Sequence, residues 1–156
     1  MALTVPIELG YEFAVKAKAA DVFALLSDVP SSVSHFPKVA KLTDEGGGVY
    51  KWEMDKVGTA QVNIQTVYAS KYASSQAKGT VTWTPVKGVG NALVGGSWQI
   101  TDDKKSTGLI LRIDGEITLP LPGLMKMVVV PVVQGEFEKL VEKYIANLIK
   151  KFGGEA

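Results

Sequence analysis

The chain has 156 residues, of which 46% are hydrophobic, and its formal net charge at pH 7 is +1. This balance excludes the broad basic surface of a nonspecific nucleic-acid-binding protein, so we expect no nucleic-acid partner. The absence of cysteine excludes disulfides, thiolate nucleophiles and cysteine metal ligands. The length suits one domain, residues 1–156.

The N-terminus and the most apolar window both bear on localisation. The first residues, MALTVPIELGYEF, lack the basic flank and unbroken apolar core of a secretory signal. The most apolar window, residues 119–133, is shorter than the ~20 residues that a membrane-spanning helix needs. It also contains three prolines and a lysine. We therefore expect a cytoplasmic protein.

The N-terminal part of the chain predicts one strand followed by two short helices. Apolar and polar residues alternate from Ile7 to Val15, which is the pattern of a half-buried strand. The next segment, KAADVFALLSDVP, predicts a helix that ends near Pro30. A second short helical turn is predicted over residues 31–35.

Between residues 39 and 119 the chain alternates between strand patterns and turn residues. The glycines at 46–48 suit a hairpin, and apolar residues then alternate with charged ones from Tyr50 to Asp55. The same split of apolar and polar positions recurs around Ile64 and continues to Ile117. We predict an antiparallel meander of about six strands with one apolar face.

After Gly123 the sequence predicts a long helix. From Phe137 to Phe152 apolar residues recur at three- and four-residue steps, as on a helix that packs on a core. The preceding residues 124–133 are apolar nearly all round, and Pro131 predicts a kink there. Stepping back from Phe137 by three and four residues predicts that Gln134, Val130 and Met127 face inward.

His35 is the chain's only histidine, and Ser32 and Ser34 lie close to it in sequence. A general base needs a partner within hydrogen-bond distance, and a local cluster does not supply the geometry of a catalytic triad. We interpret His35 as a polar residue on a short surface helix and expect no catalytic residue. One histidine with scattered carboxylates is also a poor ligand set, so no metal is expected, and no cofactor.

The predicted element order is a strand, two short helices, a meander and a long C-terminal helix. Together with ADVFALLSDV, HFPKV, EGGGVYKWEM and the PLPG before the last helix, it resembles the START-like (SRPBCC) superfamily. That superfamily includes polyketide cyclases, coenzyme Q-binding proteins and the birch-pollen allergen class. The resemblance implies an α+β helix-grip fold, in which a curved antiparallel sheet of about seven strands wraps around the long helix. It also implies an apolar cavity between them.

The inward positions of the predicted elements are mostly apolar and include all three tryptophans. Composition alone fits an ordinary packed core, whereas the resemblance favours a cavity, because pockets are lined mostly by such residues. Polar contacts that orient a ligand would come from Tyr11, Tyr50, Thr66, Tyr68 and Gln134. The predicted ligand-binding residues are Tyr11, Phe13, Trp52, Met54, Ile64, Trp83, Trp98, Leu111, Ile113, Met127, Val130 and Gln134.

Three functions remain open. The first is binding or transport of a small hydrophobic ligand, such as a lipid, isoprenoid or polyketide, without covalent chemistry. The second is a cyclase or aromatase that uses the same cavity; the inward positions offer only tyrosines and threonine as acid or base, which favours binding. The third is an accessory protein that docks transiently on a membrane or a partner through the apolar start of the last helix, beside Lys126. Ligand identity and oligomeric state stay open.

Overall fold

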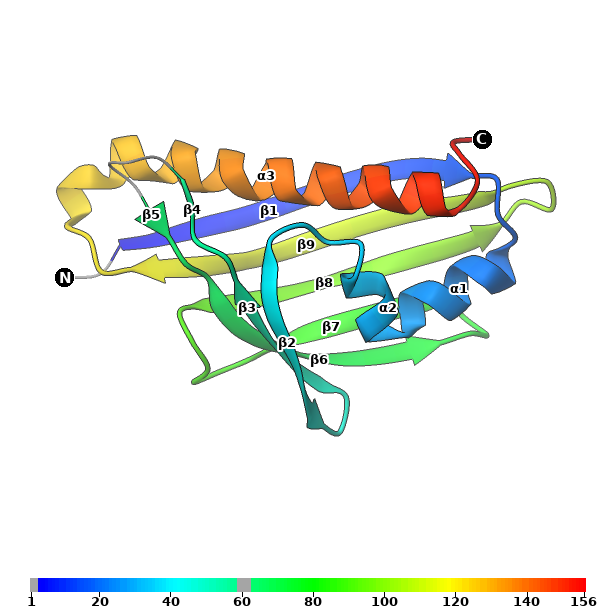
Figure 1. Cartoon of the computed structure of the whole chain (residues 1–156), viewed down its shortest axis with the longest axis horizontal. Coiled ribbons are helices and arrows are strands. Elements are labelled where there is room, and N and C mark those ends of the chain that lie inside the picture. Colours follow the sequence, from blue (N-terminus) through cyan, green and yellow to red (C-terminus); the bar gives the residue numbers. More distant parts are fainter. Residues whose placement is uncertain (1–2, 59–62) are drawn as a thin grey trace.

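A seven-stranded antiparallel sheet forms most of the protein, as the computed structural model in Figure 1 shows for residues 3–58 and 63–156. Its strand order is β1-β9-β8-β7-β6-β3-β2, so the first strand pairs with the last, and β2 forms the opposite edge. β4 and β5 form a separate ribbon. The strands are β1 (Leu3–Val15), β2 (Val39–Gly46), β3 (Val49–Met54), β4 (Val57–Gly58), β5 (Asn63–Ile64), β6 (Val67–Ser75), β7 (Thr80–Val86), β8 (Ala92–Asp102) and β9 (Thr107–Leu119).

The alternation of apolar and polar residues places one face of the sheet in the core. In β1, Val5 and Val15 are fully buried, whereas Glu8 and Glu12 are exposed. β1 pairs with β9 along its whole length, from Leu3 opposite Leu119 onward. Because residues opposite each other in an antiparallel pair point to the same face, the apolar faces of the two strands coincide. The predicted sheet and its apolar face are confirmed.

The hairpin between β2 and β3 shows why its glycines are needed. The glycines at 46, 47 and 48 all have positive φ angles, which residues other than glycine adopt only rarely. A Cβ atom at Gly48 would also lie 2.8 Å from the carbonyl oxygen of Tyr72. The predicted hairpin is confirmed. By contrast, the strand predicted around Ile64 belongs to the ribbon and not to the main sheet, and residues 59–62 lie outside the described part of the chain.

Two short helices, α1 (Ala19–Ser27) and α2 (Val29–Val33), connect β1 to β2. α1 ends before Pro30, as the sequence predicts, and Pro30 then lies in the first turn of α2. A proline is tolerated there because the first backbone N–H groups of a helix have no partner within it. α2 begins two residues before the predicted turn, since the Asp28 carboxylate accepts a hydrogen bond from the backbone N–H of Ser31 and caps the helix.

The 3-10 helix η1 (Gly123–Met125) leads into the long helix α3 (Lys126–Lys151). Figure 1 shows α3 lying along β1 across the length of the sheet. The helix continues through Pro131 without a break, and Pro131 is on its exposed side. Within the described ranges, no helix is both long and apolar enough to span a membrane.

The core between the sheet and the helices consists of two clusters. The first lies under the first half of α3 and includes Val129 and Val133. The second lies under the second half and includes Tyr144 and Leu148. Leu9 and Phe36 are partly buried side chains that pack against both clusters. The boundary between the two clusters therefore falls under the middle of α3.

Candidate functional site

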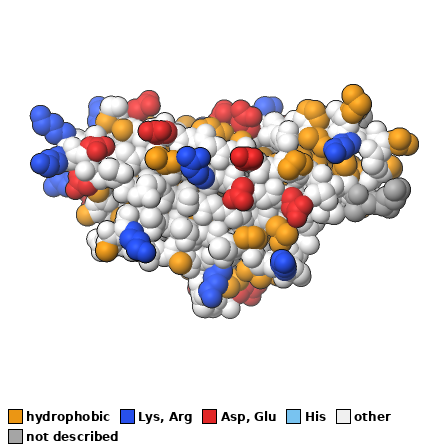
Figure 2. Space-filling model, turned by 180° about the vertical axis from the view of Figure 1, so that it is seen from behind, with side chains coloured by type: hydrophobic (Ala, Val, Ile, Leu, Met, Phe, Trp, Pro, Cys, Tyr) orange, Lys and Arg blue, Asp and Glu red, His pale blue; other side chains and the backbone are white. Residues whose placement is uncertain are grey.

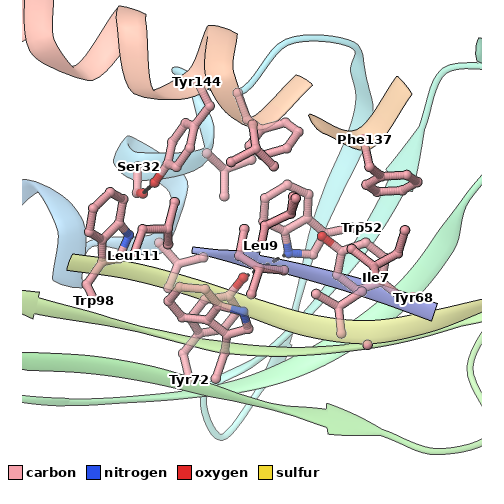
Figure 3. Close-up of a pocket in the computed structure, with 18 of the residues that line it drawn as sticks. Ile7, Leu9, Ser32, Trp52, Tyr68, Tyr72, Trp98, Leu111, Phe137 and Tyr144 are labelled. Atoms are coloured by element: carbon pink, nitrogen blue, oxygen red, sulfur yellow. Dashed lines mark hydrogen bonds between the residues drawn. The ribbon is translucent and has the colours of Figure 1, made fainter. Parts of the chain in front are cut away.

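An internal cavity lies at this boundary between the two clusters (Figure 3). The volume of this cavity is about 70 Å³. All three helices and the seven-stranded sheet contribute to its wall. The lining residues are Ile7, Leu9, Leu26, Val29, Ser32, Val33, Phe36, Trp52, Tyr68, Tyr72, Val81, Trp83, Val94, Trp98, Leu111, Ile113, Gly115, Glu116, Ile117, Phe137, Val141 and Tyr144.

Aromatic rings make up much of this wall. The Trp52 indole stacks on the Tyr68 ring at a centroid distance of 5.4 Å and an interplanar angle of 17°. Phe36 packs edge-on against Trp52 at 5.4 Å and also contacts Tyr144 at 5.1 Å. Aromatic pairs prefer stacked or edge-to-face arrangements, so these contacts hold each ring in a defined orientation. The cavity is thus bounded by flat, weakly polar surfaces.

Two hydrogen-bonded pairs are the main polar features of the cavity. The hydroxyls of Ser32 and Tyr144 share a hydrogen bond of 2.5 Å, in which either oxygen can donate. The Trp52 Nε1–H donates to the Tyr72 hydroxyl at 3.1 Å. Each pair joins elements that are distant in the sequence: the first links α2 to α3, and the second links β3 to β6. Both pairs offer a ligand neutral hydrogen-bonding groups.

The tyrosine hydroxyls of the cavity stay protonated at neutral pH. Burial raises the pKa of Tyr144 to about 12, although hydrogen bonding with the side chains of Ser32 and Trp98 partly opposes this shift. Burial is also the largest cause that raises the pKa of Tyr72 and of Tyr68 well above the ordinary value of 10.0. The one carboxylate in the lining belongs to Glu116, which is an exposed residue. The wall of the cavity is therefore largely apolar, and its buried hydroxyl groups are uncharged at neutral pH.

The raised tyrosine pKa values predict a loss of stability in alkali. The folded state keeps the Tyr144 proton between about pH 10 and 12, while the unfolded state releases it. The free energy of unfolding should thus be unaffected by Tyr144 below about pH 10 and fall as the pH rises toward 12. A two-unit shift corresponds to roughly 2–3 kcal/mol. Urea unfolding across this pH range, with tyrosinate absorbance recorded in parallel, measures the effect.

The control for this prediction is Tyr144→Phe. This variant should be less stable at neutral pH, by about 1–3 kcal/mol, because Ser32 loses its buried partner. Its stability should nevertheless fall less steeply between pH 10 and 12 than that of the parent protein. An identical alkaline slope in both proteins would contradict the assignment of the raised pKa to Tyr144.

The structure brings five of the predicted ligand-binding residues to the cavity wall. Trp52 and Trp98 are almost fully buried, and Leu111 lies opposite Trp98 in the β8–β9 pair. Trp83 and Ile113 are only partly buried but also line the cavity. All five are on strands, where alternation alone defines the inward face.

Three other predicted residues, Phe13, Tyr11 and Met54, lie on strands without lining the cavity. Phe13 packs edge-on behind Trp98 at a centroid distance of 6.0 Å. Tyr11 is partly buried in the second cluster, and Met54 is buried in the first. Ile64 belongs to β5, and its side chain lies outside the described part of the structure. Facing inward thus places a residue in the core but not necessarily at the cavity.

The predicted orientation of Met127, Val130 and Gln134 toward the cavity is wrong. Met127 is 89% exposed, and Val130 is only partly buried beside the first cluster. Gln134 is exposed and donates its Nε2–H to the carbonyl oxygen of Pro6 in β1 at 2.9 Å. The inward stripe runs back from Phe137 in four-residue steps through Val133 and Val129, which are both fully buried. It is this stripe, and not the predicted one, that packs on the sheet.

Several residues of the cavity wall are not among the predicted ligand-binding residues. Three of them, Phe137, Val141 and Tyr144, belong to the predicted helical stripe. Their place on α3 opposite the middle of the sheet is the feature that could have indicated a position in the cavity wall. Tyr72 follows Tyr68 by four residues, so the two share one face of β6. In the sequence, Ser32 stands out only as a neighbour of His35.

His35 lies just after α2 and is not part of the cavity wall. Its ring Nδ1–H donates to the carbonyl oxygen of Ser31 at 2.9 Å, because a carbonyl can only accept. The His35 carbonyl in turn accepts a hydrogen bond from Asn147 Nδ2 at 2.9 Å. The contact with Asn147 attaches the segment after α2 to α3, whereas the Ser32 hydroxyl is hydrogen-bonded to Tyr144. No Ser–His pair is assembled from Ser32 and His35. No group of three or more His, Asp and Glu side chains that could hold a metal is found in the part of the chain that the structure describes.

A curved antiparallel sheet around a long C-terminal helix, with an apolar cavity between them, defines a START-like protein of the helix-grip class. The model of the family described as "Polyketide cyclase / dehydrase and lipid transport" matches residues 7–148. The chain belongs to this family. Among curated proteins, none matches the sequence.

Solved structures share the fold at low sequence identity. A START superfamily protein from Mycobacterium smegmatis has a TM-score of 0.67 and 14% identity, covering 94% of this chain and 97% of that one. The Zhui aromatase/cyclase from Streptomyces sp. R1128 has a TM-score of 0.61 and 19% identity, covering 93% and 90%. The major latex-like protein 151 from Panax ginseng has a TM-score of 0.61 and 12% identity, covering 95% and 98%. At these identities the likeness concerns the fold alone.

Proposed function

We propose that the protein binds a small hydrophobic molecule in the cavity under α3 and carries it without covalent chemistry. The observation that carries this proposal is the apolar, aromatic wall, whose two hydrogen-bonded side-chain pairs, Ser32–Tyr144 and Trp52–Tyr72, are neutral. Lipids, isoprenoids and polyketides with an oxygen function fit this chemistry, because their apolar surface is buried while one oxygen finds a hydroxyl partner. The family description, which includes lipid transport, supports the same class of ligand.

A ligand of this class requires the cavity to widen. Ligand pockets usually enclose ~300–1,000 Å³, and the cavity offers about 70 Å³. Phe36 and Val33 line both the cavity and an open surface hollow that Pro30, Val39 and Tyr50 border. Rotation of the Phe36 ring, which is only partly buried, would join the two spaces. We infer that a ligand enters between α2 and β2.

A cyclase function is the second candidate, because the family includes polyketide cyclases. It requires a group that removes or donates a proton during the reaction. The Ser32 and Tyr144 hydroxyls would orient a carbonyl group, but burial raises the Tyr144 pKa to about 12 and makes it a poor base near neutral pH. These properties support binding over catalysis.

The proposal is tested by filling the cavity from α3. Val141 lines the cavity and is 2% exposed, so Val141→Phe should place its ring in the open space. We expect the affinity for the neutral apolar dye N-phenyl-1-naphthylamine to fall about tenfold, which corresponds to about 1.4 kcal/mol. Dye titration gives the affinity, and native mass spectrometry of the protein from its own cells shows whether a lipid-sized molecule co-purifies.

The matched control is Val133→Phe, eight residues earlier on the same helix. Val133 is fully buried and does not line the cavity, so its enlargement overpacks a closed core at a cost of about 1–3 kcal/mol. Dye affinity should stay unchanged in this variant. If Val141→Phe loses as much stability as Val133→Phe and binds the dye as the parent does, the site is a packed core and the proposal fails.

A further inference from the structure

The end of the molecule where α3 begins has an unusual surface. Leu124 is 97% exposed, Met127 is 89% exposed and Val128 is 63% exposed. They are the strongly exposed large hydrophobic side chains in the described part of the protein. Figure 2 shows hydrophobic side chains gathered at this end of the molecule, with a basic side chain among them. We call Leu124, Lys126, Met127 and Val128 the tip.

The one charged residue of the tip is basic. Between Ile117 and Gly135 the only charged residue is Lys126, which is exposed. The first turn of α3 contains no acidic residue. β4, which contacts α3, is preceded by Asp55 and Lys56, which are both exposed and carry opposite charges. The acidic residues nearest to these segments in sequence are Asp55, Glu116 and Glu136, outside the tip itself. A surface of this kind is complementary to an anionic partner.

The small size of the tip favours a lipid surface over a protein. A stable protein interface buries ~800 Å² on each partner, which needs far more than three protruding side chains. A bilayer, by contrast, rearranges around individual side chains, and the acyl boundary accepts leucine, methionine and valine. A lysine beside them reaches the phosphate groups with its ammonium while its methylene chain stays in apolar surroundings.

We propose that the tip docks on the surface of an anionic lipid membrane. Phe137, the first residue of α3 in the cavity wall, lies ten residues beyond Met127, or about 15 Å along the helix axis. Docking therefore holds the cavity close to the lipid headgroups while the sheet stays in water. The inference goes beyond the proposed function, because vesicle binding is measured without any ligand in the cavity.

The test is flotation of the full chain with vesicles. The parent protein should float with vesicles of phosphatidylcholine and phosphatidylglycerol in equal amounts, and less with pure phosphatidylcholine. Leu124→Asp combined with Met127→Asp should lower the partition coefficient by about tenfold or more. Lys126→Glu should lower it by roughly tenfold on the anionic vesicles and change little on the neutral ones.

Matched controls come from the far end of the same helix. Ala146 and Lys150 are exposed, so Ala146→Asp and Lys150→Glu repeat the charge changes away from the tip and should float as the parent does. All variants should keep the parental melting temperature and dye affinity, because the changed side chains are outside the core and the cavity. Absence of flotation of the parent, equal loss in the controls, or a dimer that dissociates in the tip variant would each overturn the proposal.

Discussion

A chain truncated after Gly135 is expected to lose cooperative unfolding altogether. The truncation removes Val141, Tyr144 and Leu148, and with them the helical side of the second cluster and part of the cavity wall. Burial of one large apolar side chain contributes about 1.5–3 kcal/mol, so the loss of several exceeds the ~5–15 kcal/mol by which a domain is stable. The sheet would then expose Trp98 and Leu111. Circular dichroism during heating measures the transition.

The control is a chain that ends at Phe152. This chain lacks residues 153–156 and therefore loses two backbone hydrogen bonds. One runs from the Lys16 N–H to the Gly154 carbonyl, and the other runs from the Ala156 N–H to the Ala14 carbonyl in β1. Each such bond contributes about 0.5–1.5 kcal/mol, so this chain should melt cooperatively at a moderately lower temperature. A sharp transition near the parental temperature after truncation at Gly135 would show that the sheet does not depend on α3.

The fold could be predicted because its elements carry strong local patterns. Alternation in the segments around Trp52 and Leu111 identified strands and their inner faces, and the stripe from Phe137 to Phe152 identified the final helix. The ribbon of β4 and β5 could not be predicted, since pairing depends on partners elsewhere in the chain. The period-two pattern near Ile64 does not say which sheet a strand joins.

The cavity could be predicted only in part, because its position depends on how the helix is rotated on the sheet. A helix turn has 3.6 residues, so stepping back from Phe137 by three or by four residues gives Gln134 or Val133. Burial favours the apolar Val133, which packs on the sheet, and Gln134 instead reaches the edge at Pro6. The Ser32–Tyr144 hydrogen bond joins residues 112 positions apart, and no local pattern indicates it.

Replacing Trp98 with alanine is expected to give the largest loss of stability for a single substitution at the cavity. Trp98 is 2% exposed, and its ring contacts Phe13 and Tyr144 at centroid distances of 6.0 and 6.2 Å. Truncation of a buried tryptophan costs about 3–5 kcal/mol, because its neighbours fill the vacated space only in part. Trp83→Ala is the control: Trp83 lines the same cavity but is partly exposed, so less burial is lost. Urea unfolding of the two variants gives the comparison.

The same pair of variants separates the role of Trp98 in the core from its role at the cavity. Trp98→Ala widens the cavity. If limited space restricts the ligand, the folded molecules of this variant should bind N-phenyl-1-naphthylamine more tightly than the parent protein does. The extra space adjoins the Ser32–Tyr144 pair, because Trp98 packs against Tyr144. Dye titration under conditions where both variants are folded measures this effect. Unchanged dye affinity together with the full loss of stability would mean that the dye binds elsewhere, and Trp98 would then be a residue of the core alone.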